Sequence, residues 1–402
     1  MIKSDRYKAK HLAKDGRKAI FEKPSFRRGT IDNNIYYLIA LVLWSLSSLV
    51  NITYINSDII SLRWFSLPVA ALLVISEIKK HSITFGSVIL FVGFGLIVLM
   101  EMLLGGRSLI ILFGLLWCGR DVPFRKIICA LTFSVGLVLS LSTALNMTGL
   151  IGGPVASRGP GTPLRYSLGF IVWTYPSYCV FAITCAICYL NENRFTFIRL
   201  IGLLIINILI YLATDTRTGF GLSLVVLLIW GINTKWHPKV LDKIFCCKVF
   251  LVIFALLAIL TAVLGLIYQP NTLIWESLNH IASGRIGYMA EAFATIPITP
   301  FGQNIDWMNK VSIIDSSYMR IVFDYGWVAL ILLLILETVA MAKLQQMHST
   351  VGVCIMTLLA VQFMFDPLMT VLYFNPWLIV GTQQCVLWLN RPKPLHLKKD
   401  RT

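Results

Sequence analysis

The sequence predicts an all-α membrane protein with about twelve transmembrane helices. Of its 402 residues, 57% are hydrophobic and only 13% are charged, whereas a soluble domain carries about 25% charged residues. Apolar segments of about 20 residues, the length with which a helix crosses a bilayer, recur through most of the chain. The alternation typical of a transmembrane β-barrel is weak. We therefore expect a polytopic helical bundle.

The expected spans fill residues 34–390, between a basic tail at 1–33 and a second at 391–402. The fourth span is short and could be tilted or re-entrant. In chain order, the spans are expected near residues 34–52, 58–77, 83–104, 108–119, 127–147, 168–190, 197–213, 219–233, 248–268, 322–342, 350–368 and 371–390.

The distribution of Lys and Arg predicts that both termini are cytoplasmic. Residues 1–30 hold ten Lys and Arg against three acids, and residues 391–402 hold five against one, so the tails supply 11 of the net +16 charges. Every connection on the same side as the tails is also basic, as the positive-inside rule requires. Because the tails flank membrane spans, we expect them to contact anionic lipid headgroups rather than nucleic acid.

Two connections on the opposite side are long, at residues 148–167 and 269–321. The first is rich in Gly and Pro, which disfavours a regular helix. The second carries apolar residues at helical spacing, which predicts one or two amphipathic helices on the outer face of the membrane. The sequence has no phosphate-binding G-x-x-x-x-G-K-[ST] loop. ATP-driven activity is therefore not expected.

Four arginines break the positive-inside pattern, because they fall near the outer ends of spans or in outer loops. A guanidinium grips phosphate oxygens at two points, so arginine in this position favours an anionic partner such as a lipid-linked diphosphate. We expect this diphosphate-binding set to comprise Arg63, Arg165, Arg217 and Arg285.

Structural roles compete with this interpretation. Arg217 lies in a tight turn, where Gly219 allows close backbone approach; the alternative is that it snorkels or pairs with Asp215. Arg285 could lie on the solvated face of an amphipathic helix. Arg63 could be a structural partner of a buried acid such as Glu101 or Asp366.

Transfer of a group from such a lipid-linked diphosphate to a sugar hydroxyl would also need a group that accepts the proton of the attacking hydroxyl. Asp315 precedes Ser-Ser-Tyr318 at the edge of a span and is one candidate. His280 is the one histidine expected on the outer side and is the other, with Glu276 and Glu291 as weaker alternatives. We expect no cofactor and no metal, since outer acid clusters are missing, so the arginines would stabilise the leaving diphosphate instead.

At these residues the chain resembles the O-antigen polymerase and ligase superfamily, particularly the Wzy-type polysaccharide polymerases. The resemblance covers roughly residues 35–390, and Ser283 and Gly219 belong to its motifs. In order, the motifs are R-x-S-L-G-F (165–170), T-R-T-G (216–219), S-G-R (283–285), F-G (301–302), D-S-S-Y (315–318) and Y-G (325–326). In such polymerases R-x-S-L-G-F is often followed by His-Pro-Asn, where this chain has Tyr175-Pro176-Ser177.

The resemblance implies a metal-independent, inverting glycosyltransferase of the GT-C class in the bacterial inner membrane. Such enzymes join undecaprenyl-diphosphate-linked oligosaccharide repeat units into a capsule, exopolysaccharide or O-antigen, working beside a flippase and a chain-length regulator. A ligase that moves finished glycan to another acceptor would use the same groups. A flippase for the same lipid-linked unit would fit twelve spans, but such transporters carry internal repeats and midplane charges, which we do not find.

Overall fold

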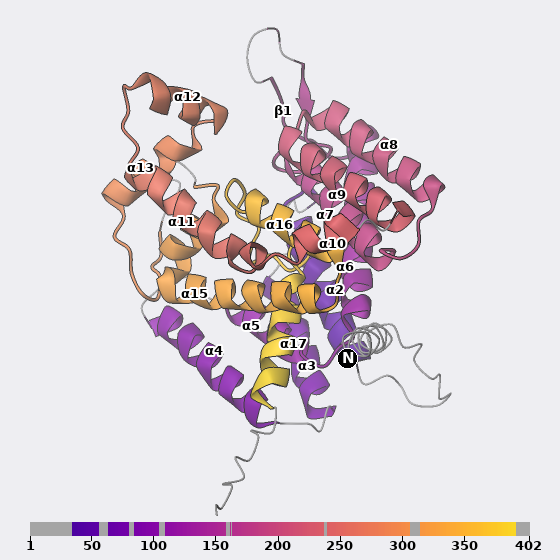
Figure 1. Cartoon of the computed structure of the whole chain (residues 1–402), viewed down its shortest axis with the longest axis vertical. Coiled ribbons are helices and arrows are strands. Elements are labelled where there is room, and N and C mark those ends of the chain that lie inside the picture. Colours follow the sequence, from indigo (N-terminus) through magenta and orange to yellow (C-terminus); the bar gives the residue numbers. More distant parts are fainter. Residues whose placement is uncertain are drawn as a thin grey trace, which may run out of the picture.

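The computed structural model describes residues 34–55, 63–79, 84–103, 109–157, 161, 163–236, 239–305 and 314–390. These residues form 15 α-helices, one short 3-10 helix and one two-stranded antiparallel sheet (Figure 1). The prediction of an all-α fold is confirmed for this part of the chain. Both basic tails fall outside the described residues, as does the side chain of Arg63, the first residue of α3.

The first part of the chain builds one side of the bundle. Its elements are α2 (Ile35–Val50), α3 (Arg63–Lys79), α4 (Phe85–Leu103), α5 (Ile110–Cys118), α6 (Phe124–Met147), β1 (Val155–Ala156), β2 (Arg165–Tyr166), α7 (Tyr175–Leu190), α8 (Phe197–Thr214) and α9 (Arg217–Trp236).

The second part begins with a short helix beyond α9 and ends with three helices that meet in the core. Its elements are α10 (Lys239–Phe245), η1 (Lys248–Val252), α11 (Ile253–Leu266), α12 (Leu273–Ile281), α13 (Arg285–Thr295), α15 (Ser317–Gln346), α16 (Thr350–Gln362) and α17 (Trp377–Leu389).

The prediction of twelve spans is wrong in number. By length and composition, five helical segments of the described residues can cross a membrane: α6, α8, α9, η1 with α11, and α15. Five further apolar helices, α2, part of α4, α7, α16 and α17, have between 10 and 17 residues. These helices indicate a multi-pass membrane protein, but not one with twelve full-length spans.

Turns account for part of the difference, and short helices for another part. The span expected at 168–190 is helical only from Tyr175, and the span expected at 371–390 only from Trp377. The span expected at 108–119 yields the nine-residue α5. Apolar composition predicts that a segment is buried, but it does not distinguish burial in lipid from burial against other parts of the protein. Parts of these segments turn inside the protein instead of continuing through lipid.

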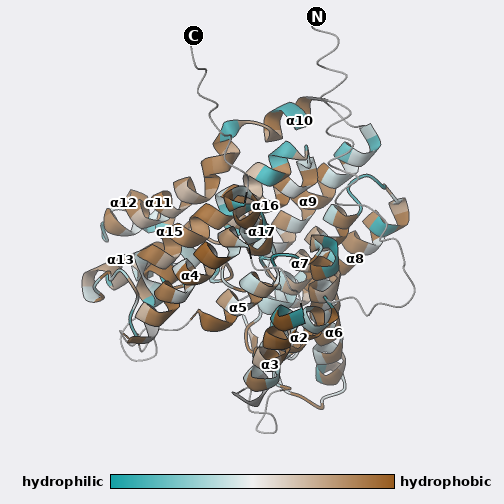
Figure 2. Cartoon of the chain, turned by 90° about the horizontal axis from the view of Figure 1, so that it is seen from below, coloured by the Kyte–Doolittle hydropathy of each residue, from teal (hydrophilic) through white to brown (hydrophobic). Residues whose placement is uncertain are grey.

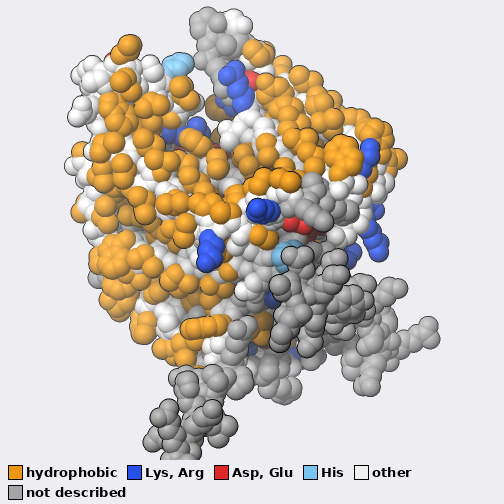
Figure 3. All heavy atoms as spheres, in the orientation of Figure 1, with side chains coloured by type: hydrophobic (Ala, Val, Ile, Leu, Met, Phe, Trp, Pro, Cys, Tyr) orange, Lys and Arg blue, Asp and Glu red, His pale blue; other side chains and the backbone are white. Residues whose placement is uncertain are grey.

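Outward-facing apolar surface supports the membrane assignment. Only 17% of the apolar window in α8 and 22% of that in η1 and α11 is buried inside the protein. Apolar residues run along nearly every helix (Figure 2), and hydrophobic side chains cover most of the face in Figure 3, with a few Lys and Arg between them. An apolar surface of this extent needs lipid to cover it.

Helix α15 organises the core and is broken near its beginning. It packs against α17, α11 and α16. At Gly326 the backbone leaves the helical region (φ 87°, ψ 163°). The amides of Trp327 and Val328, freed by this break, donate to the carbonyls of Thr299 and Pro300, both at 3.2 Å. A side chain at Gly326 would collide with the Pro300 carbonyl. The chain after α13 is thereby fastened into the break.

The long connection at 269–321 forms helices, as expected. They are α12 and α13, tied together where Asn279 Oδ1 accepts from the Gly287 amide at 3.0 Å. α13 buries Ile286, Met289 and Ala292 against the bundle, whereas α12 buries none of its residues. The other long connection, 148–167, holds the β1–β2 pair instead of a helix.

Candidate functional site

A cavity of about 760 Å³ lies at the Ser317 end of α15. Its walls come from β2, the first turn of α7, α13, the beginning of α15 and the connection between α16 and α17. Three arginines and three aspartates line it. They are Arg165, Arg285, Arg320, Asp315, Asp324 and Asp366.

The segment from Arg165 to Phe170 fixes the position of the Arg165 side chain. This segment joins the end of α2 through a bridge between Thr53 and Phe170. It turns sharply at Leu168 (φ 54°) and Gly169 (φ 83°), and a side chain at Gly169 would collide with Ser142 of α6. Arg165 Nε donates to the Thr214 carbonyl at 2.9 Å, and its guanidinium lies 5.1 Å from the centre of the Trp173 ring. Its position is therefore fixed by backbone and ring contacts.

Arg285 lies between two carboxylates. Ser283 and Gly284 both have positive φ (54° and 84°), so the chain reverses before α13 begins at Arg285. Its Nε donates to Asp315 Oδ2 at 3.1 Å, and its Nη2 lies 3.9 Å from Asp366 Oδ1. The side chain is 25% exposed. One guanidinium therefore connects two acids from different connections, Asp315 just before α15 and Asp366 between α16 and α17.

Arg320 and Asp324 form a second pair one helical turn apart on α15. Arg320 Nε donates to Asp324 Oδ2 at 2.7 Å, with the carboxylate side chain 2% exposed and the guanidinium 19% exposed. The i,i+4 spacing places both on the helix face that lines the cavity. The break at Gly326 immediately follows this pair and so fixes how the short first part of α15 points.

Asp366 lies in the connection between α16 and α17, outside both helices, and is almost fully buried. Its Oδ1 accepts a hydrogen bond from the Tyr178 hydroxyl, while its Oδ2 has no hydrogen-bond partner among the described residues. Burial raises the pKa of Asp366 to about 6, against the opposing effects of the Tyr178 hydrogen bond and the positive charge of Arg285. This carboxyl therefore keeps its proton to a higher pH than an ordinary aspartate does.

Ser317 fixes the backbone around Asp366. Its Oγ donates to the Asp366 carbonyl at 2.5 Å and accepts from the amides of Leu368 and Met369 at 2.8 and 3.1 Å. Asn375 Nδ2 then donates to the Met369 carbonyl at 2.8 Å and to Glu337 Oε1 at 2.6 Å. The floor of the cavity is thus a loop held by side chains of α15.

Asp315 is the more accessible of the two acids that face Arg285, with a side chain 39% exposed against 5% for Asp366. Burial raises its pKa above the ordinary value of 3.8, although the charge and hydrogen bond of Arg285 act in the opposite direction. A hydroxyl entering the cavity could reach Asp315 without displacing protein atoms, which suits a proton acceptor.

These groups suit an anionic ligand that also carries an apolar or ring-shaped portion. Guanidinium forks bind phosphate oxygens at two points, and three of them line one cavity. The aromatic residues Trp173, Tyr175, Tyr288 and Tyr325 line the same space, with faces large enough to pack on sugar rings. No group of three or more His, Cys, Asp or Glu side chains suited to a metal ion occurs among the residues that the structure describes.

The cavity brings together three of the residues expected from the sequence: Arg165, Arg285 and Asp315. Arg217 does not line it. The Arg217 side chain is 72% exposed, and its Nε lies 3.9 Å from Asp215 Oδ1, as the pairing interpretation predicted. His280 is exposed on α12 and also lies outside the cavity lining.

The three supporting residues have structural positions. Tyr318 is fully buried, and its hydroxyl donates to the Ala360 carbonyl at 2.8 Å. A side chain at Gly219 would collide with Ser177, so this glycine lets α9 pack closely on α7. Ser283 lies in the reversal that positions Arg285.

Sequence reasoning missed Arg320, Asp324, Tyr178 and the role of Asp366. The Arg-x-x-x-Asp spacing after D-S-S-Y was a usable signal for the first two, since it puts both on one helix face. Asp366 was considered only as a partner of Arg63. No local pattern could have paired it with Tyr178, because 188 residues separate the two.

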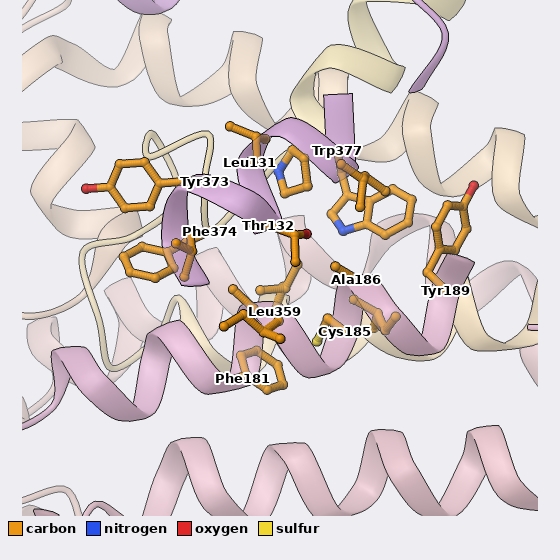
Figure 4. A pocket seen from close by; sticks show the side chains of 16 residues that line it. Leu131, Thr132, Phe181, Cys185, Ala186, Tyr189, Leu359, Tyr373, Phe374 and Trp377 are labelled. Atoms are coloured by element: carbon orange, nitrogen blue, oxygen red, sulfur yellow. The ribbon is translucent and has the colours of Figure 1, made fainter. Parts of the chain in front are cut away.

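A second cavity, between α6, α7, α16 and the start of α17, is small and apolar (Figure 4). Its volume of about 30 Å³ has room for about one water molecule. Leu131, Phe181, Leu359 and Trp377 point into it, and no charged residue lines it. The cavity at Ser317 is larger and is lined by the three arginines and three aspartates, so it is the candidate site.

Comparisons of the chain with protein-family models, with curated proteins and with solved structures found no match.

Proposed function

We propose that this protein is a bacterial inner-membrane glycosyltransferase that polymerises undecaprenyl-diphosphate-linked oligosaccharide repeat units into a surface polysaccharide. One observation carries the proposal: three arginines and an accessible carboxylate line one cavity at the end of an apolar helical bundle. A lipid-linked diphosphate has its tail in lipid and its charge at the membrane surface. The arginines of such a cavity would bind the diphosphate, while the lipid tail stays in the bilayer beside the apolar helices.

In the proposed reaction, Arg285 and Arg320 hold the diphosphate of the donor, and Arg165 holds that of the acceptor. The acceptor hydroxyl attacks the anomeric carbon, the new C–O bond forms, and the bond to the diphosphate oxygen breaks with inversion. Asp315 takes the proton of the hydroxyl, and the leaving diphosphate keeps the bonding electron pair. The arginines stabilise the charge that develops on it.

Arg320 replaces Arg217 in this proposal because Arg320 lines the cavity and Arg217 does not. Asp315 is preferred to His280 as proton acceptor for the same reason.

The first test is to delete the gene and resolve lipid-linked sugars by size and by leaflet. Single repeat units accumulating on lipid at the outer leaflet would support a polymerase. Long polymer remaining on its lipid carrier would instead identify a ligase, and units retained at the inner leaflet would identify a flippase. Unchanged lipid-linked sugars and unchanged surface polysaccharide would refute the proposal.

A further inference from the structure

The charges that line the cavity cancel. Three arginines face three aspartates, so with every group ionised the cavity offers no excess of positive charge to an anion. Arg285 is the clearest case, since Asp315 and Asp366 already occupy two sides of its guanidinium. An incoming diphosphate diester, which carries two negative charges, must compete with these carboxylates for the same N–H groups.

Asp366 is the carboxylate whose charge can change most readily without loss of structure. Its loop is fixed through its backbone by Ser317 Oγ, and its carboxylate adds one hydrogen bond, accepted from the Tyr178 hydroxyl. The side chain faces Tyr175 and Tyr178 from α7, Arg285 from α13, Asp315 just before α15, and Gln362 from α16. Arg285 is the one cation in this group, and its Nη2 lies 3.9 Å from Asp366 Oδ1.

We propose that Asp366 is a positioning residue that couples anion binding to proton uptake: when Asp366 takes up a proton from solvent, Arg285 is released from it to grip the diphosphate. This inference rests on the proposed function, because it concerns the same cavity. It assigns Asp366 an action through Arg285 and not on the reacting atoms. Tyr178 sets the balance, because its hydroxyl stabilises the ionised form of Asp366 by hydrogen bonding.

The sign and size of the effect follow from linkage. If the protonated form binds the anion, the affinity is complete below the pKa of Asp366, about 6, and decreases about tenfold for each pH unit above it. Without Asp366 this dependence vanishes. Without the Tyr178 hydroxyl, the ionised form of Asp366 loses a hydrogen bond, so the inflection moves to higher pH.

The experiment measures the dissociation constant of symmetrical dimethyl diphosphate on the purified full chain by calorimetry between pH 5 and pH 8. This diester has no second ionisable oxygen on either phosphorus, so its own charge is constant in that range. We expect wild type to show the inflection near pH 6. Asp366→Asn should bind equally at every pH, as tightly as wild type does at low pH, and Tyr178→Phe should shift the inflection upward.

Two variants separate this inference from the proposed function. Asp315→Asn retains Asp366 and should keep an inflection, whereas Arg285→Gln should weaken binding at every pH. Binding that requires Arg285 but shows no pH inflection in wild type would overturn the inference and leave the proposed function standing. No binding at any pH would overturn both. An inflection that persists in Asp366→Asn would assign the proton to another group.

Discussion

Replacement of Arg285 by lysine tests the proposed grip most directly. Arg285 directs Nε to Asp315 at 3.1 Å and Nη2 toward Asp366 at 3.9 Å, and a single ammonium cannot reproduce two separated donors. The charge is kept, so the loss is about one charge-assisted hydrogen bond, about 1.5–3 kcal/mol. At 1.4 kcal/mol per factor of ten, kcat/KM should decrease roughly tenfold to 150-fold.

The assay is glycosyl transfer by the purified chain in lipid nanodiscs, with a short-prenyl diphosphate oligosaccharide as donor and acceptor. Arg217→Lys is the matched control, because its side chain is 72% exposed and lies outside the cavity lining. It should keep kcat/KM within about twofold, since exposed ion pairs contribute little. A full loss in Arg217→Lys, with Arg285→Lys as active as wild type, would refute the assignment of the grip to this cavity.

Three further predictions concern the structure around the site. Gly326→Ala should lower the unfolding temperature in detergent, because it combines a strained φ of 87°, worth about 1–3 kcal/mol, with a collision against backbone. Gly136→Ala, inside α6 with nothing within 4 Å, is its control and should leave the unfolding temperature unchanged or slightly raised. Ser317→Ala leaves the buried Met369 amide without an acceptor, at about 1–3 kcal/mol, whereas the Leu368 amide keeps the Asp366 carbonyl at 2.9 Å. Hydrogen exchange at the Met369 amide should therefore become faster, and unchanged exchange there would contradict the role of Ser317. Asp315→Asn should reduce kcat by about 10²- to 10⁴-fold and retain diphosphate binding. Wild-type kcat should decrease on acidification through the pKa of Asp315, which lies above 3.8. A pH-independent kcat would exclude Asp315 as the proton acceptor.

The class of fold was predictable, because long apolar segments leave few alternatives to membrane helices. The number of spans was not. Hydropathy alone does not distinguish a residue that faces lipid from one that faces another helix, and the residues before Tyr175 and Trp377 are apolar yet form turns. Their backbone is satisfied by contacts with distant segments, such as Ile171 with Ile52, which no local window contains.

The site also contains residues that were predictable from the sequence and residues that were not. Arg165, Arg285 and Asp315 were predictable because a charged residue at the edge of an apolar segment needs an explanation. Arg217 met the same criterion, but its side chain is exposed and lies beside Asp215. Its exposed position and this neighbour explain the charge without a ligand. The role of Asp366 was not predictable from the sequence, because it depends on contacts with Tyr178 and Arg285 that only the fold creates. Contacts between distant parts of the chain, and not unusual local composition, determine its environment.

The order in which the cavity residues occur along the chain has a consequence for biosynthesis. Arg165 and Arg285 are made before any of the three aspartates that face them, and Asp366 is the last member of the set. A chain emerging from the ribosome therefore carries uncompensated positive charge at this end of the bundle until its final loop is in place, since domains form as synthesis proceeds. Premature termination before Asp366 would leave a membrane-inserted product with three cavity arginines against two aspartates, an excess of one positive charge at this end of the bundle.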